Sequence, residues 1–209
     1  SGGNGTVTLN GTGGIGGSSN FGVALSDPNS TVTTSGAGDL SITGHGGSGT
    51  GPAQRGVVVS AAATVSSTNA GKVTINGTGG SGSSDNYGVD VVDANSLVTT
   101  TGTGDLSITG VAGPGTGGNL IGVEIRVTST VSSTGGGKVS VNGTGGSSTT
   151  FNAGVIVTND HVIRGASEIH IVLADGRQLD AEVIGSDADA DLAVLKVTTK
   201  GALPFAKLG

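Results

Sequence analysis

The segment "GTVTLNGTGG" at positions 5–14 recurs along the chain at a constant spacing. Related segments begin at positions 38 (GDLSITGHGG), 71 (GKVTINGTGG), 104 (GDLSITGVAG) and 137 (GKVSVNGTGG), so each step is 33 residues. A fixed period of this length is the signature of a repeat architecture. The first, third and fifth segments resemble one another more than they resemble the other two, which makes 66 residues the full unit.

Each 33-residue copy holds three short segments in which apolar and polar residues alternate, as in strands with one buried face. The first segments supply the apolar pairs Val7 and Leu9, Leu40 and Ile42, Val73 and Ile75, Leu106 and Ile108, and Val139 and Val141. The second segments supply Val23 and Leu25, Val57 and Val59, Val89 and Val91, and Val123 and Ile125. The third segments are marked by Val32, Val65, Val98 and Val131. The pattern predicts an all-β fold, a right-handed parallel β-helix of five 33-residue coils over residues 5–157.

The composition fits the narrow interior of stacked coils. The chain has 43 Gly, three Phe and one Tyr, and it has no Trp, Met or Cys. Coils about 4.8 Å apart place identical side chains on top of one another, and small β-branched residues fill such an interior well. Glycine permits the sharp corners. This region resembles the solenoid repeats of bacterial surface and autotransporter-type proteins.

Charge and hydropathy exclude some functions. Nine basic and 15 acidic residues give a net charge of −6, which disfavours nucleic acid as a partner. The absence of cysteine excludes a disulfide framework and a thiolate metal site. No apolar run approaches the roughly 20 residues of a membrane-spanning helix, so we expect no membrane span. The opening "SGGNG" has no charged-then-apolar leader, and we expect a mature fragment or a piece of a longer protein.

Two repeated features are candidate surface sites with simpler structural explanations. "NGT" at Asn10, Asn76 and Asn142 matches the glycosylation sequon, but Asn-Gly is also a preferred corner dipeptide, and the 66-residue spacing suggests an asparagine ladder. Thr31 and Thr33, echoed in later copies, predict an outward hydroxyl column. Such a column could bind ice or sugar, although outward threonine is also ordinary on a β-surface.

The repeats offer no cofactor or metal site. His45 occupies a slot filled by threonine or valine in the other copies, and one substituted slot does not make a metal site. The glycine-rich calcium repeat is absent as well. We therefore expect no cofactor and no metal.

The period fails near residue 158. Position 164, where the next third-segment valine is due, holds Arg164, and charged residues become more frequent. The sequence predicts two units: a β-helix repeat domain at 1–157 and a different module at 158–209.

Four motifs in the second module carry a resemblance to the first barrel of the HtrA (Deg) family of trypsin-like serine proteases. They are "TNDHVI" at 158–163, "VLADGRQLDAEVIGSD" at 172–187, "DLAVLKV" at 191–197 and "LPFAKLG" at 203–209. The resemblance implies an antiparallel β segment derived from half of a trypsin-like barrel. It also implies His161 as the general base of a catalytic triad and Asp191 as the carboxylate that orients it.

The residues of this module support a hairpin independently of the resemblance. Asp175-Gly176 between alternating runs is a hairpin-turn signal that pairs 168–174 with 178–184. On the first of these strands Ile169 and Ile171 face one way and His170 the other. We therefore expect His170 to face solvent.

The nucleophile of the triad has no counterpart in this sequence. The family supplies its serine and oxyanion hole from a G-N-S-G-G loop of a second barrel, and residues 1–209 contain no G-x-S-G-G segment. His161 and Asp191 are therefore expected to be vestigial. In the family about two barrel strands precede the strand that carries the histidine, and in this sequence solenoid repeats occupy their place. "NFGVALS" at 20–26, "NYGVDVV" at 86–92 and "NAGVIVT" at 152–158 lie 66 apart, so we expect one strand to serve both modules.

Three interpretations of function remain open on the sequence. The first is a non-catalytic structural chimera in which the half-barrel covers the solenoid end. The second is a fragment of a serine endopeptidase that cleaves peptide or protein substrates only when a second barrel is supplied. The third is a surface-binding, adhesin-type solenoid. Self-association through the solenoid end or by hairpin exchange is a further expectation. The parent modules point to the periplasm, the cell surface or secretion, and natural and engineered origins both remain open.

Overall fold

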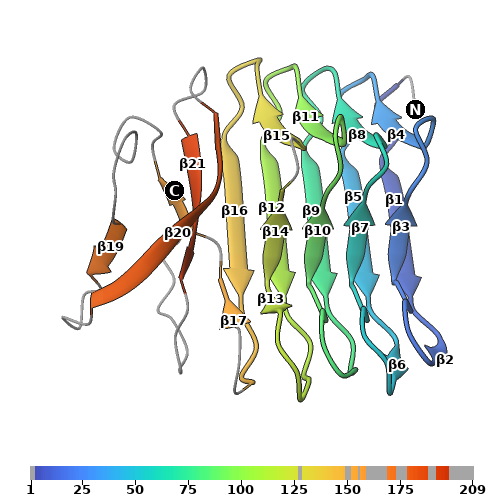
Figure 1. The fold of residues 1–209 in the computed structure, drawn as a ribbon. Coiled ribbons are helices and arrows are strands. Elements are labelled where there is room, and N and C mark those ends of the chain that lie inside the picture. The colour runs from blue at the N-terminus through green and yellow to red at the C-terminus, as the bar shows by residue number, and fades with distance from the viewer. Residues whose placement is uncertain are drawn as a thin grey trace.

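The computed structural model describes residues 3–126, 129–148, 152–154, 156–158, 169–172, 178–187 and 192–197, and every regular element in these ranges is a β-strand. Seventeen strands belong to a solenoid and four to an antiparallel sheet at its C-terminal end (Figure 1). The all-β class and the parallel β-helix are thus confirmed.

Three parallel sheets form the sides of the solenoid. The first has the order β1-β5-β9-β12-β16 and comprises β1 (Val7–Thr12), β5 (Leu40–His45), β9 (Val73–Thr78), β12 (Leu106–Val111) and β16 (Val139–Thr144). The second comprises β3 (Val23–Leu25), β7 (Val57–Val59), β10 (Val89–Val91) and β14 (Val123–Ile125). The third comprises β4 (Thr31–Thr34), β8 (Thr64–Ser67), β11 (Leu97–Thr100) and β15 (Thr130–Ser133). Two short parallel pairs lie between the first and second sheets: β2 (Ile15–Gly16) with β6 (Ser48–Gly49), and β13 (Leu120–Ile121) with β17 (Asn152–Ala153).

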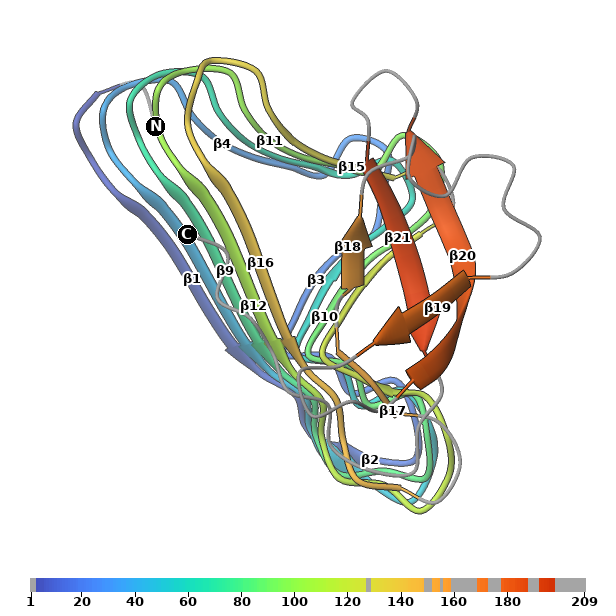
Figure 2. The same ribbon diagram turned by 90° about the vertical axis from the view of Figure 1, so that its left-hand side faces the viewer.

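The coils are right-handed and nearly superimposed. Figure 2 looks along the stack from its C-terminal end, where the first-sheet strands run down one side and the second-sheet strands run up the other. The chain therefore circulates counterclockwise as it approaches the viewer. The register is in step across the whole first sheet, since Val7 pairs with Leu40, Leu40 with Val73, Val73 with Leu106 and Leu106 with Val139.

The predicted apolar columns form one continuous core. Ile42, Ile75 and Ile108 are fully buried in the first sheet, and the valines of the second and third sheets pack against them. The glycine of the "NGT" and "TG" dipeptides lies inside each first-sheet strand and not at a corner. A Cβ at Gly44 or Gly77 would collide with the backbone of the second-sheet entry at Gly56 or Gly88, so the close approach of two chain segments requires glycine there.

The fifth coil is incomplete. The first sheet has five strands, but the second and third have four each among the described residues, which gives about four turns. The segment expected to add a fifth second-sheet strand, β18 (Ile156–Thr158), pairs antiparallel with β21 (Leu192–Val197) instead. The prediction that this strand serves both modules is therefore wrong: among the described residues β18 pairs only with β21 of the C-terminal sheet.

Two consecutive alanines adopt a left-handed backbone at a coil corner. The φ angles of Ala61 and Ala62 are 52° and 63°. A Cβ is unfavourable in this region, and glycine relieves that cost at some loss of chain entropy. Replacing each alanine with glycine is expected to raise the free energy of unfolding by roughly 0.5–1 kcal/mol.

Urea unfolding of the two variants measures this gain. Ala63→Gly is the matched control, because Ala63 is fully buried and is not among the residues with positive φ, so this change should lower stability. An equal loss of stability in all three variants would show that the corner is not strained.

Candidate functional site

The predicted catalytic residues His161 and Asp191 lie outside the described residues, but the strands next to them are described. β18 and β21 pair antiparallel, with Thr158 opposite Ala193. In an antiparallel pair the end of one strand lies beside the start of the other. The chain therefore leaves β18 toward His161 at the same end of the pair at which it enters β21 from Asp191.

The hairpin of the C-terminal module is present. β19 (Ile169–Val172) pairs antiparallel with β20 (Gln178–Asp187), and β20 continues the sheet to β21 with an irregularity between Val183 and Gly185. Asp180, which pairs in register with His170, has an exposed side chain. The side chain of His170 and the Asp175-Gly176 turn lie outside the described residues, so the solvent-facing position of His170 stays a prediction.

The Thr31/Thr33 column is not a free surface over the middle coils. Its members Ser66 and Thr99 are only 9% and 7% exposed, and the hydroxyls of Thr33 and Thr99 bond to Ser66 and Ser132 of the next coils. Neighbouring hydroxyls thus satisfy one another across coils.

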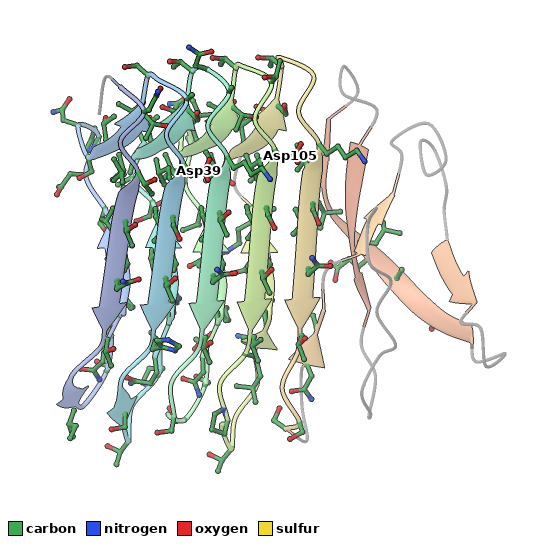
Figure 3. All side chains as sticks on the ribbon, turned by 180° about the vertical axis from the view of Figure 1, so that it is seen from behind. Asp39 and Asp105 are labelled. Atoms are coloured by element: carbon green, nitrogen blue, oxygen red, sulfur yellow. The ribbon has the colours of Figure 1, made fainter. Side chains whose placement is uncertain are left out.

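The outer face of the first sheet is regular, and its outward residues are exposed or half-buried. Asn10, Asn76 and Asn142 face outward there, but Thr43 and Thr109 stand between them, so the asparagines do not form an uninterrupted ladder. His45 ends β5 in register with Thr12 and Thr78 and is exposed. A row of alternating charge borders this face: the carboxylates of Asp39 and Asp105, labelled in Figure 3, accept backbone N–H bonds from Lys72 and Lys138 one coil further on.

A buried ionic cluster on the outer face of the second sheet was not predicted from the sequence. The side chain of Asp90 is fully buried, and one oxygen pairs with Arg55 at 2.6 Å. The Arg55 guanidinium lies 4.7 Å from the ring centre of Tyr87 and 5.9 Å from that of Phe21, and stacks between them. One coil further on, Arg126 pairs with Glu124 at 2.9 Å. Asp90 lies between Val89 and Val91, and this alternation predicts that its side chain is exposed to solvent. The pattern gives no sign that this face of the sheet is covered.

Burial dominates the electrostatics of this cluster. Removal from water raises the pKa of Asp90 to about 6, although Arg55 acts in the opposite direction; Glu124 raises the pKa further, Arg126 lowers it and Asp93 raises it. Burial also raises the pKa of Tyr87. The second carboxylate oxygen of Asp90 has no hydrogen-bond partner, which agrees with a carboxylate whose desolvation exceeds what its ion pair returns.

The raised pKa of Asp90 predicts a pH-dependent stability. A carboxyl group with a pKa near 6 in the folded state and 3.8 in the unfolded state binds more protons when folded between these values. Its contribution to stability is complete below pH 3.8 and is lost as the pH rises through 6. Relative to Asp90→Asn, the wild-type chain should lose on the order of 2–3 kcal/mol of unfolding free energy between about pH 4 and pH 7.

Urea unfolding at several pH values tests this directly. Asp39→Asn is the control, because Asp39 is exposed on the first sheet. A pH dependence of Asp90→Asn that parallels that of the wild type would contradict the assignment.

A ladder of amide side chains holds the loops between the first and second sheets; Gln54 and Asn86 are fully buried, and Asn20 is half-buried. The side-chain amide of Asn20 donates a hydrogen bond to the side-chain oxygen of Gln54 at 2.7 Å. The side-chain amide of Asn86 donates to the backbone carbonyls of Gly82 and Pro114 at 3.1 and 2.7 Å. The Asn86 side-chain oxygen accepts from the Gln54 backbone at 3.3 Å. The sequence shows this signal as N-F-G, Q-R-G, N-Y-G and N-A-G in four copies, whereas the copy before Val123 has L-I-G at 120–122.

Asn86→Leu is expected to destabilise the solenoid by about 3 kcal/mol, because it removes three hydrogen bonds: two that the Asn86 amide donates to the carbonyls of Gly82 and Pro114, and one that its oxygen accepts from the Gln54 N–H. The shape of leucine is tolerated in this slot, since Leu120 occupies it one coil further on. Thermal unfolding measures the loss. Asn20→Leu, which removes a single side-chain bond, should cost clearly less, and equal costs would argue for a steric origin.

The described residues hold no group of three or more metal-binding side chains. No helix in the described ranges has the length and apolarity needed to cross a membrane.

Comparison with known proteins identifies the C-terminal part. Residues 135–209 match the trypsin-like peptidase domain. A putative serine protease HhoA from Synechocystis sp. is 51% identical over 59 residues, which are 28% of this chain and 15% of that protein. Serine endoprotease DegS from Escherichia coli K12 is 51% identical over 51 residues, 24% of this chain and 14% of that protein. A probable periplasmic serine endoprotease DegP-like from Rickettsia conorii is 48% identical over 56 residues, 27% of this chain and 11% of that protein.

The chain thus spans between 11 and 15% of the length of these relatives. The C-terminal part is homologous to trypsin-like serine proteases of the HtrA type, as the four motifs indicate, and the N-terminal part is a β-solenoid. The family match begins at residue 135, so it includes β16, which continues the first sheet of the solenoid.

Proposed function

We propose that residues 1–209 form a structural chimera: a β-solenoid at 1–157 joined to a first-barrel fragment of an HtrA-like serine protease at 158–209, with no catalytic activity of its own. The antiparallel register of β18 and β21 is the observation that supports the protease assignment best. In this register the chain leaves β18 toward His161 and enters β21 from Asp191 at the same end of the strand pair. A base and an orienting carboxylate need that proximity.

A histidine and an aspartate alone do not hydrolyse peptides. Acyl transfer needs a hydroxyl nucleophile within hydrogen-bond reach of the imidazole and donors for the oxyanion. The residual catalysis of incomplete triads depends on the oxyanion hole and the binding cleft. Within residues 1–209 no G-x-S-G-G segment supplies these groups.

Labelling with a fluorophosphonate probe and digestion of fluorescent casein test the proposal. Neither reaction is expected above background with the 209-residue chain. His161→Ala serves as the matched control. Labelling of any serine that disappears in His161→Ala would overturn the non-catalytic assignment.

A complementation arm distinguishes the endopeptidase alternative. The second barrel of an HtrA relative is added in trans, with and without its serine. Casein cleavage that requires this serine together with His161 and Asp191 would establish the chain as half of a peptidase whose substrates are proteins. No cleavage is expected, because the first barrel has solenoid in place of its leading strands.

The proposed location follows from the parent modules. HtrA-type relatives include proteins named as periplasmic, and the solenoid resembles surface repeats. We propose a periplasmic, cell-surface or secreted protein. Detection of the chain only in the cytosolic fraction of its host would contradict this.

A further inference from the structure

The outer face of the first sheet presents a two-dimensional array of uncharged polar side chains. Five strands in register place three outward residues each on this face: Thr8, Asn10, Thr12; Ser41, Thr43, His45; Thr74, Asn76, Thr78; Ser107, Thr109, Val111; and Ser140, Asn142, Thr144. All but His45 and Val111 carry a hydroxyl or an amide. With strands about 4.8 Å apart and alternate residues about 6.7 Å apart, these groups form a lattice.

The face is flat as well as regular. In Figure 2 the five strands appear as neighbouring lines of similar inclination, each displaced a little from the next, and Figure 3 shows their outward side chains standing in parallel rows. Most sheets twist by roughly 20–25° per strand, so a flat five-stranded face is unusual and is maintained here by stacked identical coils. A flat face fits an extended surface better than it fits a small molecule, which requires a concave site.

Most polar groups of this face are available to a partner; the side-chain oxygen of Asn142 is an exception, since it is buried without a hydrogen-bond partner. Among the described residues of the face, a side-chain hydrogen bond joins Asn142 to Ser140 within one strand, at 3.4 Å. On the third sheet, by contrast, hydroxyls bond to each other across coils. Two chemically similar faces of one solenoid therefore differ: one satisfies its own hydroxyls across coils, and the other leaves them to solvent or to a partner.

The charge distribution restricts the partner. No carboxylate, ammonium or guanidinium lies on the face, and the charges of Asp39, Lys72, Asp105 and Lys138 alternate in sign along its border. Such a surface attracts neither a polyanion nor a polycation. Hydroxyls donate and accept, and an asparagine amide offers two donors and one acceptor, which suits the neighbouring hydroxyls of a sugar ring.

We propose that the outer face of the first sheet is a docking surface for a neutral, insoluble polysaccharide. The coil array matches repeating hydroxyl groups by many weak hydrogen bonds, several of them through water. Each contact is weak, and the affinity comes from their number along a rigid lattice. This function is independent of the protease-derived module.

Sedimentation of the whole 209-residue chain with microcrystalline cellulose or chitin powder tests the proposal. The chain should bind at least one of them, and the bound fraction should change less than about twofold between about 0.05 and 1 M salt, because no charge contributes. The double variant Thr43→Arg/Thr109→Arg introduces bulk and charge at the centre of the face and should reduce binding by about tenfold or more.

Thr50→Arg/Thr116→Arg is the matched control. It makes the same two threonine-to-arginine changes, with the same 66-residue spacing, at exposed loop positions away from the face, and it should bind as the wild type does. Unchanged melting temperatures show that both variants are folded. The proposal is overturned by no binding to either polysaccharide, by binding lost at high salt, by equal loss in both variants, or by partition into growing ice in place of binding to the glycans.

Discussion

Ile75→Asp is expected to prevent the solenoid from folding. Ile75 is fully buried at the middle of the first sheet, between Ile42 and Ile108 of the adjacent coils. A carboxylate there would have no cation and no free N–H, because the ladder uses the backbone groups around it. The expected loss is about 5 kcal/mol, a large part of the stability of an ordinary domain.

Asn76→Asp is the matched control for this change. Asn76 is the next residue of the same strand, faces outward and is exposed. The same new charge placed there should leave the protein folded, with a melting temperature within a few degrees of the wild type. Circular dichroism and size-exclusion chromatography compare the two variants, and a soluble Ile75→Asp chain with cooperative, unchanged melting would refute the inward column.

The inward columns were predictable because the repeat and the strand alternation carry the same information. Val32, Val65, Val98 and Val131 recur every 33 residues and pair in register in the third sheet. Stacking requires identical side chains to meet, and identity is visible in a sequence. The repeat pattern also predicted the right-handed coil, and the family motifs predicted the C-terminal antiparallel sheet.

The outward features were less predictable, since the sequence does not show the shape of the cross-section. Asp90 and Ser66 occupy outward positions of their strands, yet the side chains of both are buried. Glu124 gives the same alternation as an exposed residue would, although it belongs to an ion pair. The outward array of Asn76 and its neighbours was partly visible as "NGT", but its interleaving with threonine depends on the coil register.

The register also explains why the strand at the junction, β18, pairs differently from the expectation. The repeat "NAGVIVT" fits the next second-sheet strand, but the protease-derived strand β21 competes for the same residues. Leu195 of β21 is buried and pairs with Ile156. The sequence of β18 fits two strand patterns, and only the three-dimensional structure shows which of the two partner strands it pairs with.

Removal of residues 165–209 is expected to convert the protein from a soluble species into aggregates or fibres. The deletion takes away β19, β20 and β21, which form the antiparallel sheet beyond the last coil in Figure 1. Val141, in the last coil, is only 8% exposed, whereas Leu9, the equivalent residue of the first coil, is partly exposed. Val139 of the same strand remains 38% exposed, so the cover of the last coil is partial, and its strand edges would become more available for pairing once the antiparallel sheet is removed.

The effect of the deletion is expected to be large because the exposed edges lie in register. Three parallel edges at β14, β15 and β16 would face solvent together, and a repeat protein with an uncovered end adds further molecules there. Light scattering and thioflavin binding over a range of protein concentrations measure the result, with the full-length chain as reference. A second truncation that removes only residues 198–209 keeps all four strands of the antiparallel sheet and should remain soluble. If the longer deletion stays monomeric and melts at the wild-type temperature, the C-terminal module does not cap the solenoid, and its fusion to the repeats has no role in their stability.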